Sequence, residues 1–274
     1  MIRMELYVMK FGGNAIRGRE AMMRLCREIA QMTSQGARVI LVHGGGPEIS
    51  AEMERRGMQP KKVAGIRVTD LQTLDVTEKV LSDLNRDVVG CLTEAGVSAI
   101  GMPGYHCAMF VRKPPMKVIE DGIEKEVDVG LVGEVSECDP TPLMDLLEQG
   151  IVPGIYPIGK DKDGRRLNVN ADTMVAGIAA SVPCKEMLAI TDVPGILMDV
   201  NDPGSKLDRV TLEEIDGLIA RGVISGGMVP KVEACRKAIM AGVSTVRMVN
   251  GTDPECIVAD VMKEGNLRGT IIVK

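Results

Sequence analysis

The chain alternates short apolar runs with amphipathic segments from end to end, and this alternation constrains its fold more than any other feature. Residues 6–9 and 39–42 are continuous apolar runs, the pattern of strands buried on both faces. Between them, residues 22–29 carry apolar side chains at helical spacing. The alternation continues through 187–190 and ends with 270–273. It predicts an α/β protein, with an open, mostly parallel sheet between two helical layers in a three-layer αβα arrangement.

The length of 274 residues suits about two domains. The strand–helix alternation starts again after residue 182, so we expect an N-terminal lobe over residues 1–182 and a C-terminal lobe over 183–274. Between residues 108 and 135, charged residues alternate with Val and Ile around Asp121-Gly122. This segment predicts a β-hairpin lying over the core.

Composition argues against several classes of protein. The net charge is −5 and aromatic residues make up 2%, so the basic face and stacking platforms of nucleic-acid binders are not expected. No apolar run approaches the roughly 20 residues of a membrane-spanning helix. Seven cysteines without a Cys-x-x-Cys pair, and only two histidines, argue against a zinc site or a disulfide framework. We therefore expect a cytoplasmic protein with no nucleic-acid or membrane partner and no metal-ligand cluster.

Glycine-rich turns follow the first two predicted strands. Lys10 ends the first strand, and Gly12 and Gly13 after it let backbone N–H groups approach a phosphate beside the lysine amine. Gly44 and Gly45 separate the second strand from a helix, whose N-terminus can bind an anion. Ligands bind at this end of parallel strands. Each turn alone also fits an ordinary tight turn.

Three polar residues precede or begin predicted helices in the expected N-terminal lobe. Arg67 lies just before a helix cap, and its planar guanidinium suits a carboxylate. Asn168 and Asp172 flank the start of a helix of small residues, where an amide can hydrogen-bond a substrate and a carboxylate can orient lysines or a metal ion. An asparagine cap with an acidic first turn explains the same residues without function.

The second half of the chain repeats the combination of glycine-rich turn, helix start and lysine in residues 225–231. Lys10 and Lys231 could therefore hold a phosphoryl group between them. Residues 191–195 end another predicted strand and fit either the border of a nucleotide pocket or a plain turn.

Six strings in this order resemble those of the amino acid kinase family, over nearly the whole chain. They are residues 10–15, 43–47, 65–70, 167–172, 191–197 and 225–231. The branch that phosphorylates N-acetyl-L-glutamate fits them best. The resemblance implies a carbamate kinase-like fold, with an N-terminal lobe for the acyl amino acid and a C-terminal lobe for ATP. It also implies transfer of a phosphoryl group from ATP to the γ-carboxylate of N-acetyl-L-glutamate, the second step of arginine biosynthesis.

The resemblance further implies a role for each residue that matches the family strings. Lys10 and Lys231 would neutralise the transferring phosphoryl group, and Asp172 would orient both lysines. The substrate would be bound by Gly13, Gly44, Gly45, Arg67 and Asn168, with Arg67 on the α-carboxylate. ATP with its Mg²⁺ would be bordered by Gly12, Thr191, Asp192, Gly195, Gly226, Gly227, Met228 and Lys231.

One loop departs from the family pattern. Members commonly carry Gly-Leu-Ser-Gly-x-Asp-Gly near residue 100, whereas residues 101–107 here place His106 where the aspartate is expected. A rival interpretation is therefore a kinase of carrier-protein-bound aminoadipate or glutamate, in lysine or ornithine biosynthesis. A rival of another class is a non-catalytic amino-acid sensor of the same fold, although the presence of both lysines argues against it. The long helix expected near 71–95 makes a homodimer the expected assembly, on family architecture.

Overall fold

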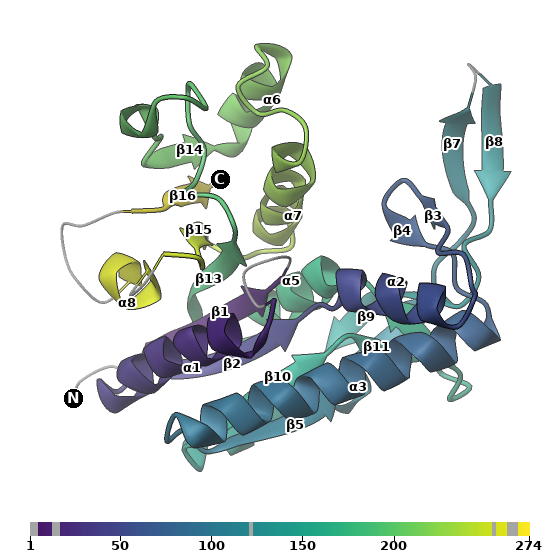
Figure 1. Cartoon of the computed structure of the whole chain (residues 1–274), viewed down its shortest axis with the longest axis horizontal. Coiled ribbons are helices and arrows are strands. Elements are labelled where there is room, and N and C mark those ends of the chain that lie inside the picture. Colours follow the sequence, from purple (N-terminus) through teal and green to yellow (C-terminus); the bar gives the residue numbers. More distant parts are fainter. Residues whose placement is uncertain (1–4, 13–16, 121–122, 254–255, 262–267) are drawn as a thin grey trace.

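The computed structural model describes residues 5–12, 17–120, 123–253, 256–261 and 268–274. Its central feature is a sheet of eight strands (Figure 1). In spatial order these are β14 (Arg209–Thr211), β16 (Thr270–Val273), β15 (Thr245–Asn250), β13 (Cys184–Thr191), β1 (Leu6–Phe11), β2 (Arg38–His43), β10 (Val152–Tyr156) and β5 (Ala99–Pro103). All neighbouring pairs are parallel except β15 and β16. The predicted open, mostly parallel sheet is confirmed.

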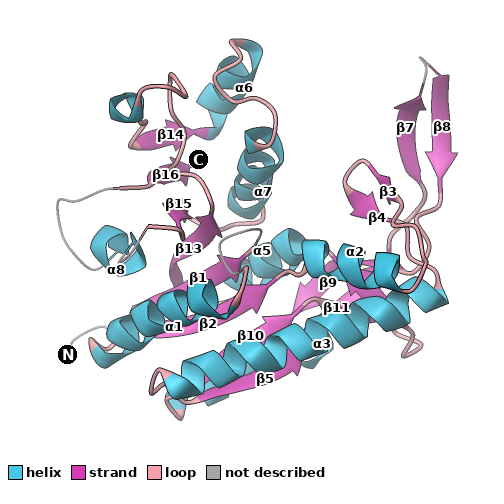
Figure 2. Cartoon of the chain, viewed as in Figure 1, coloured by secondary structure: helices cyan, strands magenta, loops and turns pink. Residues whose placement is uncertain are grey.

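Helices cover both faces of this sheet, because side chains along each strand alternate between two apolar clusters. On β1, Tyr7 and Met9 join the cluster under α1 (Arg19–Ser34), α3 (Leu71–Glu94) and α8 (Cys256–Val261). Leu6 and Val8 join the cluster of the opposite layer. That layer holds α4 (Thr141–Glu148), α5 (Ala171–Ser181), α6 (Leu212–Ala220) and α7 (Met228–Met240). The αβα layering is confirmed, and Figure 2 shows α1 and α3 side by side on their face.

A second, smaller sheet lies beside the first and was not predicted from the sequence. Its strands are β11 (Ile158–Lys160), β12 (Arg166–Val169), β9 (Val132–Cys138) and β6 (Ala108–Arg112). Two-stranded hairpins are formed by β3 (Lys62–Val63) with β4 (Ile66–Arg67), and by β7 (Met116–Glu120) with β8 (Ile123–Val127). The remaining elements are α2 (Gly46–Arg55) and the 3₁₀ turns Gly104–His106 and Pro203–Ser205.

The predicted hairpin in the 108–135 segment exists as β7 and β8, but its predicted position over the core is wrong. The hairpin projects away from the body of the molecule (Figure 1). Its described side chains are mostly exposed, since charged residues occupy half of the positions in the two strands and leave no continuous apolar face to bury. The tip, Asp121-Gly122, lies outside the described residues.

Two helices, α3 and α5, begin where the sequence supplies a capping side chain. Asp70 accepts a hydrogen bond from the Thr73 N–H at 2.7 Å and so starts α3. Asn170 accepts from the Asp172 N–H at 2.7 Å and starts α5. Each cap satisfies a backbone donor that the helix itself cannot pair. The N-termini of these helices therefore lie at defined positions near the strand ends.

The predicted lobe boundary at residues 182 and 183 falls between α5 and β13. β13 pairs with β1 along its length, so the sheet continues from one predicted lobe into the other. The division into an N-terminal and a C-terminal lobe stays a prediction. Within the described residues, no helix combines the length and apolar character that crossing a membrane requires.

Candidate active site

A cavity of about 310 Å³ opens at the carboxyl ends of β1 and β2. It is lined by residues from four of the strings singled out in the sequence. These are Lys10, Gly12, Gly44, Gly45, Arg67, Asn168 and Asp172. The structure therefore gathers most of the expected phosphoryl-transfer and substrate residues in one place. Gly13 lies outside the described residues.

Lys10 is held in the middle of the sheet, between two parallel neighbours. Its backbone lies opposite Val42 of β2 and Ala189 of β13. Its Nζ lies 2.9 Å from Oδ1 of Asp172, which is in the first turn of α5, where the helix dipole stabilises a carboxylate. A Cβ on Gly12 would lie 2.6 Å from this Nζ, so the glycine leaves room for the amine to fold back over the turn. The result is a partly exposed ammonium group in a fixed position.

The glycine turn after β2 lies against α3. A Cβ on Gly45 would be only 2.9 Å from Cδ2 of Leu81 on α3, so a larger residue here would require the Leu81 side chain to shift. Gly46 begins α2, with Pro47 in its first turn. The positive end of the α2 dipole consequently lies at the cavity, an arrangement that favours bound anions.

His43, the last residue of β2, is a packed residue and not a base. Its Nδ1 lies 2.8 Å from the Gly44 carbonyl oxygen, and its Nε2 lies 3.0 Å from Nδ2 of Asn85 on α3. A neutral ring satisfies both contacts by donating from Nδ1 and accepting at Nε2. Complete burial lowers the pKa of His43 to about 4. The ring thus joins the glycine turn to α3 in an uncharged form.

Arg67 is a buried cation with no carboxylate partner among the residues that the structure describes. It is 7% exposed, and its Nη2 donates to the Gly46 carbonyl at 3.0 Å and to Ser50 Oγ at 2.8 Å. Its Nη1 faces Met53 Sδ at 3.2 Å. Burial lowers the pKa of the guanidinium. A buried cation held by neutral acceptors at the wall of a cavity favours an anionic ligand.

Asn168 is connected to Arg67 through Thr69. The Asn168 amide donates to Thr69 Oγ1 at 3.0 Å, and that hydroxyl donates to the Arg67 carbonyl at 2.8 Å. Thr69 is fully buried, so these bonds are shielded from water. Two strings that lie about one hundred residues apart in the sequence therefore share one hydrogen-bonded chain.

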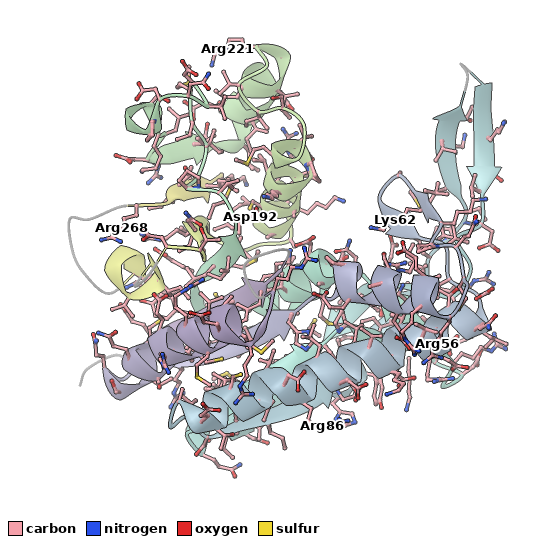
Figure 3. The ribbon with its side chains drawn as sticks, viewed as in Figure 1. Arg56, Lys62, Arg86, Asp192, Arg221 and Arg268 are labelled. Atoms are coloured by element: carbon pink, nitrogen blue, oxygen red, sulfur yellow. The ribbon has the colours of Figure 1, made fainter. Side chains whose placement is uncertain are left out.

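The second lysine has its own carboxylate. Lys231, in α7, forms an ion pair with Asp192, which directly follows β13 (Figure 3). In the structure, Asp172 pairs with Lys10, and Lys231 pairs with Asp192. The expectation that Asp172 orients both lysines stays a prediction. Neither Lys231 nor Asp192 lines the cavity.

The other expected nucleotide residues lie around this second pair, in turns that explain their residue types. Thr191 Oγ1 closes a turn on the Val193 carbonyl at 3.1 Å. Gly195 has φ +128°, and a Cβ there would lie 2.5 Å from Thr270 Oγ1. Gly226 has φ +53°, and Gly227 and Met228 begin α7. Their part in nucleotide binding stays a prediction.

Three charged residues of the cavity were missed by sequence reasoning. Lys62, labelled in Figure 3, is paired with Arg67 in the β3–β4 hairpin, a position that only the hairpin register reveals. Lys113 forms an ion pair with Glu134 in the same cavity, and nothing in the sequence links these residues. The departing loop at 101–107 contributes no residue to the described lining.

Comparison with known proteins adds three findings. The model of the amino acid kinase family matches residues 5–250. An acetylglutamate kinase of Methanosarcina mazei is 37% identical over 270 residues, covering 97% of this chain and 92% of that protein. Among solved structures, smu.665 from Streptococcus mutans UA159 matches with a TM-score of 0.73 at 25% identity, covering 98% of both chains. A Giardia carbamate kinase matches with a TM-score of 0.70 at 16% identity over 99% of both chains, which shows the shared fold.

The buried His43 makes stability depend on pH. The unfolded chain takes up a proton near pH 6.5, whereas the folded protein does so only near pH 4, so stability falls as the pH is lowered between these values. The loss is on the order of 3 kcal/mol. In H43Q, thermal melting measured from pH 7 to pH 4 should show a shallower loss than in the unsubstituted protein. H106Q, which removes an exposed histidine, should keep the original slope; equal slopes in all three proteins would contradict the assignment.

Proposed function

The chain belongs to the amino acid kinase family, and on that premise we propose that it phosphorylates N-acetyl-L-glutamate. The γ-phosphoryl group of ATP is transferred to the γ-carboxylate of the acyl amino acid, and ADP is released. This reaction is the second step of arginine biosynthesis. Relatives named acetylglutamate kinase that span nearly the whole chain support it.

The observation that carries the proposal is one cavity that holds both a carboxylate-binding cation and a lysine for phosphoryl transfer. Arg67 is buried there without a carboxylate partner among the described residues, and it is suited to the α-carboxylate of the substrate. Lys10, oriented by Asp172, lies in the same lining and is suited to the phosphoryl group. Gly44 and Gly45 bring the α2 N-terminus to the reacting carboxylate, and Asn168 borders the acylamino end.

The chemical step needs no base from the protein. One oxygen of the γ-carboxylate attacks the γ-phosphorus of ATP, and the bond from that phosphorus to the bridging oxygen breaks, with the electron pair leaving on ADP. The attacking carboxylate is already deprotonated at neutral pH. The protein contributes positioning and charge neutralisation, by Lys10 from the substrate side and Lys231 from the nucleotide side.

The nucleotide binds on the side of β13 and α7, where Lys231 and Asp192 meet. Thr191 ends β13, Met228 begins α7, and Gly12, Gly195, Gly226 and Gly227 lie outside the helices and strands. Mg²⁺ enters with the nucleotide, because it is held largely by phosphates with one or two carboxylates. Asp172 and Asp192 are the carboxylates beside the two lysines, and this donor set fits such an ion.

We place the protein in the cytoplasm. Six cysteines of the described residues are free thiols, and four of these are buried, a state that a reducing compartment preserves. Fractionation of cells that produce the untagged chain checks this; recovery with a secreted or membrane fraction would contradict it.

A homodimer formed along α3 and β5 is the proposed assembly. β5 is an edge strand of the central sheet, and Ile100 on it is 45% exposed. Exposed apolar groups on an open edge favour association. Light scattering should give twice the chain mass, and I100E should shift the mass toward that of one chain. A monomer at micromolar concentration would overturn this assembly.

ADP release measured with N-acetyl-L-glutamate, with L-glutamate and with no acceptor tests the proposed function. Release should require N-acetyl-L-glutamate. K10A and K231A should each lower kcat about a hundred- to a thousandfold, because each charge acts mainly in the transition state. K79A, an exposed lysine on α3, is the matched control and should keep kcat. ADP release with a carrier-linked aminoadipate alone would favour the rival interpretation, a kinase of carrier-bound substrates. No ADP release with any acceptor would favour a non-catalytic amino-acid sensor.

Arg67 should control the affinity for N-acetyl-L-glutamate through its planar guanidinium group. R67K loses one charge-assisted hydrogen bond to the α-carboxylate, so KM for N-acetyl-L-glutamate should rise roughly ten- to a hundredfold. KM for ATP should stay within about twofold, since the nucleotide binds elsewhere. R56K, at the exposed residue that follows α2, is the control and should leave both values unchanged. An equal rise in both KM values would remove Arg67 from the substrate site.

A further inference from the structure

The cavity carries a net charge of +2 before any ligand binds. Its described lining has four cations, Lys10, Lys62, Arg67 and Lys113, and two carboxylates, Glu134 and Asp172. Both carboxylates are engaged by lysines: Asp172 by Lys10 and Glu134 by Lys113. The charge that remains comes from Arg67 and Lys62, which lie opposite each other on the β3–β4 hairpin. Like charges on directly opposite residues of a hairpin destabilise the fold, and an anion bound in the cavity relieves this repulsion.

The Lys113–Glu134 pair lies on the wall that holds Asn168. Val132 of β9 pairs with Asn168 of β12, and Glu134 is two residues further along β9, on the same face of the sheet. Lys113 follows β6, and its backbone N–H donates to the Val132 carbonyl at 2.8 Å. The Lys113 side chain is 19% exposed and that of Glu134 is 42% exposed. An ion pair therefore stands beside the amide that borders the acylamino end of the substrate.

We propose that Lys113 makes this site selective for N-acylated amino acids over free ones, by neutralising Glu134. This inference rests on the proposed function. N-acetyl-L-glutamate carries two negative charges at neutral pH and balances the cavity. Free L-glutamate has an additional ammonium group, so its net charge is −1 and it leaves the cavity with excess positive charge.

The ammonium group of free glutamate also lacks a counter-ion in this site. Glu134 lies two residues beyond the strand partner of Asn168, and Lys113 already pairs with it. Like-charge contact with Lys113 then disfavours the free amino acid, which is selection by repulsion and not only by attraction. An acylated nitrogen is uncharged and meets no such penalty.

Substitution of Lys113 tests this selectivity directly. K113Q lowers the cavity charge by one and frees Glu134 as a counter-ion for an ammonium group. The ratio of kcat/KM for N-acetyl-L-glutamate to kcat/KM for L-glutamate should then fall at least about tenfold. Calorimetric titration with each amino acid, without ATP, should show the same change in relative affinity.

Three matched variants keep the test falsifiable. K113R retains the charge and should retain the ratio of the unsubstituted protein. K113Q/E134Q restores the net charge of +2 without the free carboxylate, so the ratio should return toward the original value. E134Q raises the charge and should leave the preference for N-acetyl-L-glutamate intact. A thermal melt of each variant confirms folding.

The outcomes separate this inference from the function on which it rests. An unsubstituted protein that does not phosphorylate N-acetyl-L-glutamate removes the proposed function. In the other case, the unsubstituted protein phosphorylates N-acetyl-L-glutamate, but K113Q lowers kcat/KM equally for both amino acids. Lys113 and Glu134 then have a purely structural role, and only the inference is overturned.

Discussion

The ion pair between Lys10 and Asp172 is the interaction on which the candidate site depends. Lys10 is in register with residues of two parallel neighbours, so its backbone cannot shift without breaking the middle of the sheet. Asp172 reaches it from the first turn of α5, and Gly12 leaves the space in which the two meet. The amine is therefore positioned by the fold before a substrate arrives. Preorganised charge of this kind stabilises a transition state without reorganisation during the reaction.

The buried Arg67 lowers the stability of the folded protein but equips the site to recognise an anion. Burying a guanidinium without a carboxylate partner costs free energy, and neutral acceptors such as the Gly46 carbonyl and Ser50 hydroxyl offset only part of that cost. In the proposed function, the α-carboxylate of the substrate would supply the missing partner. The Asn168–Thr69 bonds hold the strand that carries Arg67 against the small sheet. The same cation that destabilises the empty cavity thus provides its affinity for an anion.

The two lysine–carboxylate pairs lie on different parts of the sheet edge, and this separation suits a two-substrate reaction. Lys10 and Asp172 belong to the cavity, whereas Lys231 and Asp192 join α7 to the end of β13. Because β13 pairs with β1, the two pairs are carried by adjacent strands. In the proposed reaction, a phosphoryl group passing between them would meet positive charge from both sides.

The sequence by itself determined the layered α/β architecture and the mostly parallel sheet of buried strands. It also contains the strings that form the cavity. These features could be identified because buried strands, capped helices and glycine turns are local features with a fixed period or a short motif. Each of Lys10, Arg67 and Asp172 also fitted an ordinary local role, and their site roles were predicted through the family strings to which they belong. The projecting position of β7–β8 was decided only in the tertiary structure, because it depends on what the neighbouring elements leave uncovered.

The pairing of charged residues that lie far apart along the chain likewise could not be predicted from the sequence. Which carboxylate meets which lysine depends on the directions of α5 and α7 relative to the sheet, and Asp192 has no local link to Lys231. Lys62 faces Arg67 only through hairpin register, and Lys113 meets Glu134 only because β6 pairs with β9. Charge pairing inside a cavity is set by the approach of segments distant along the chain. The sequence therefore determined which groups are available for chemistry, and the tertiary structure decided which of their charges remain uncompensated.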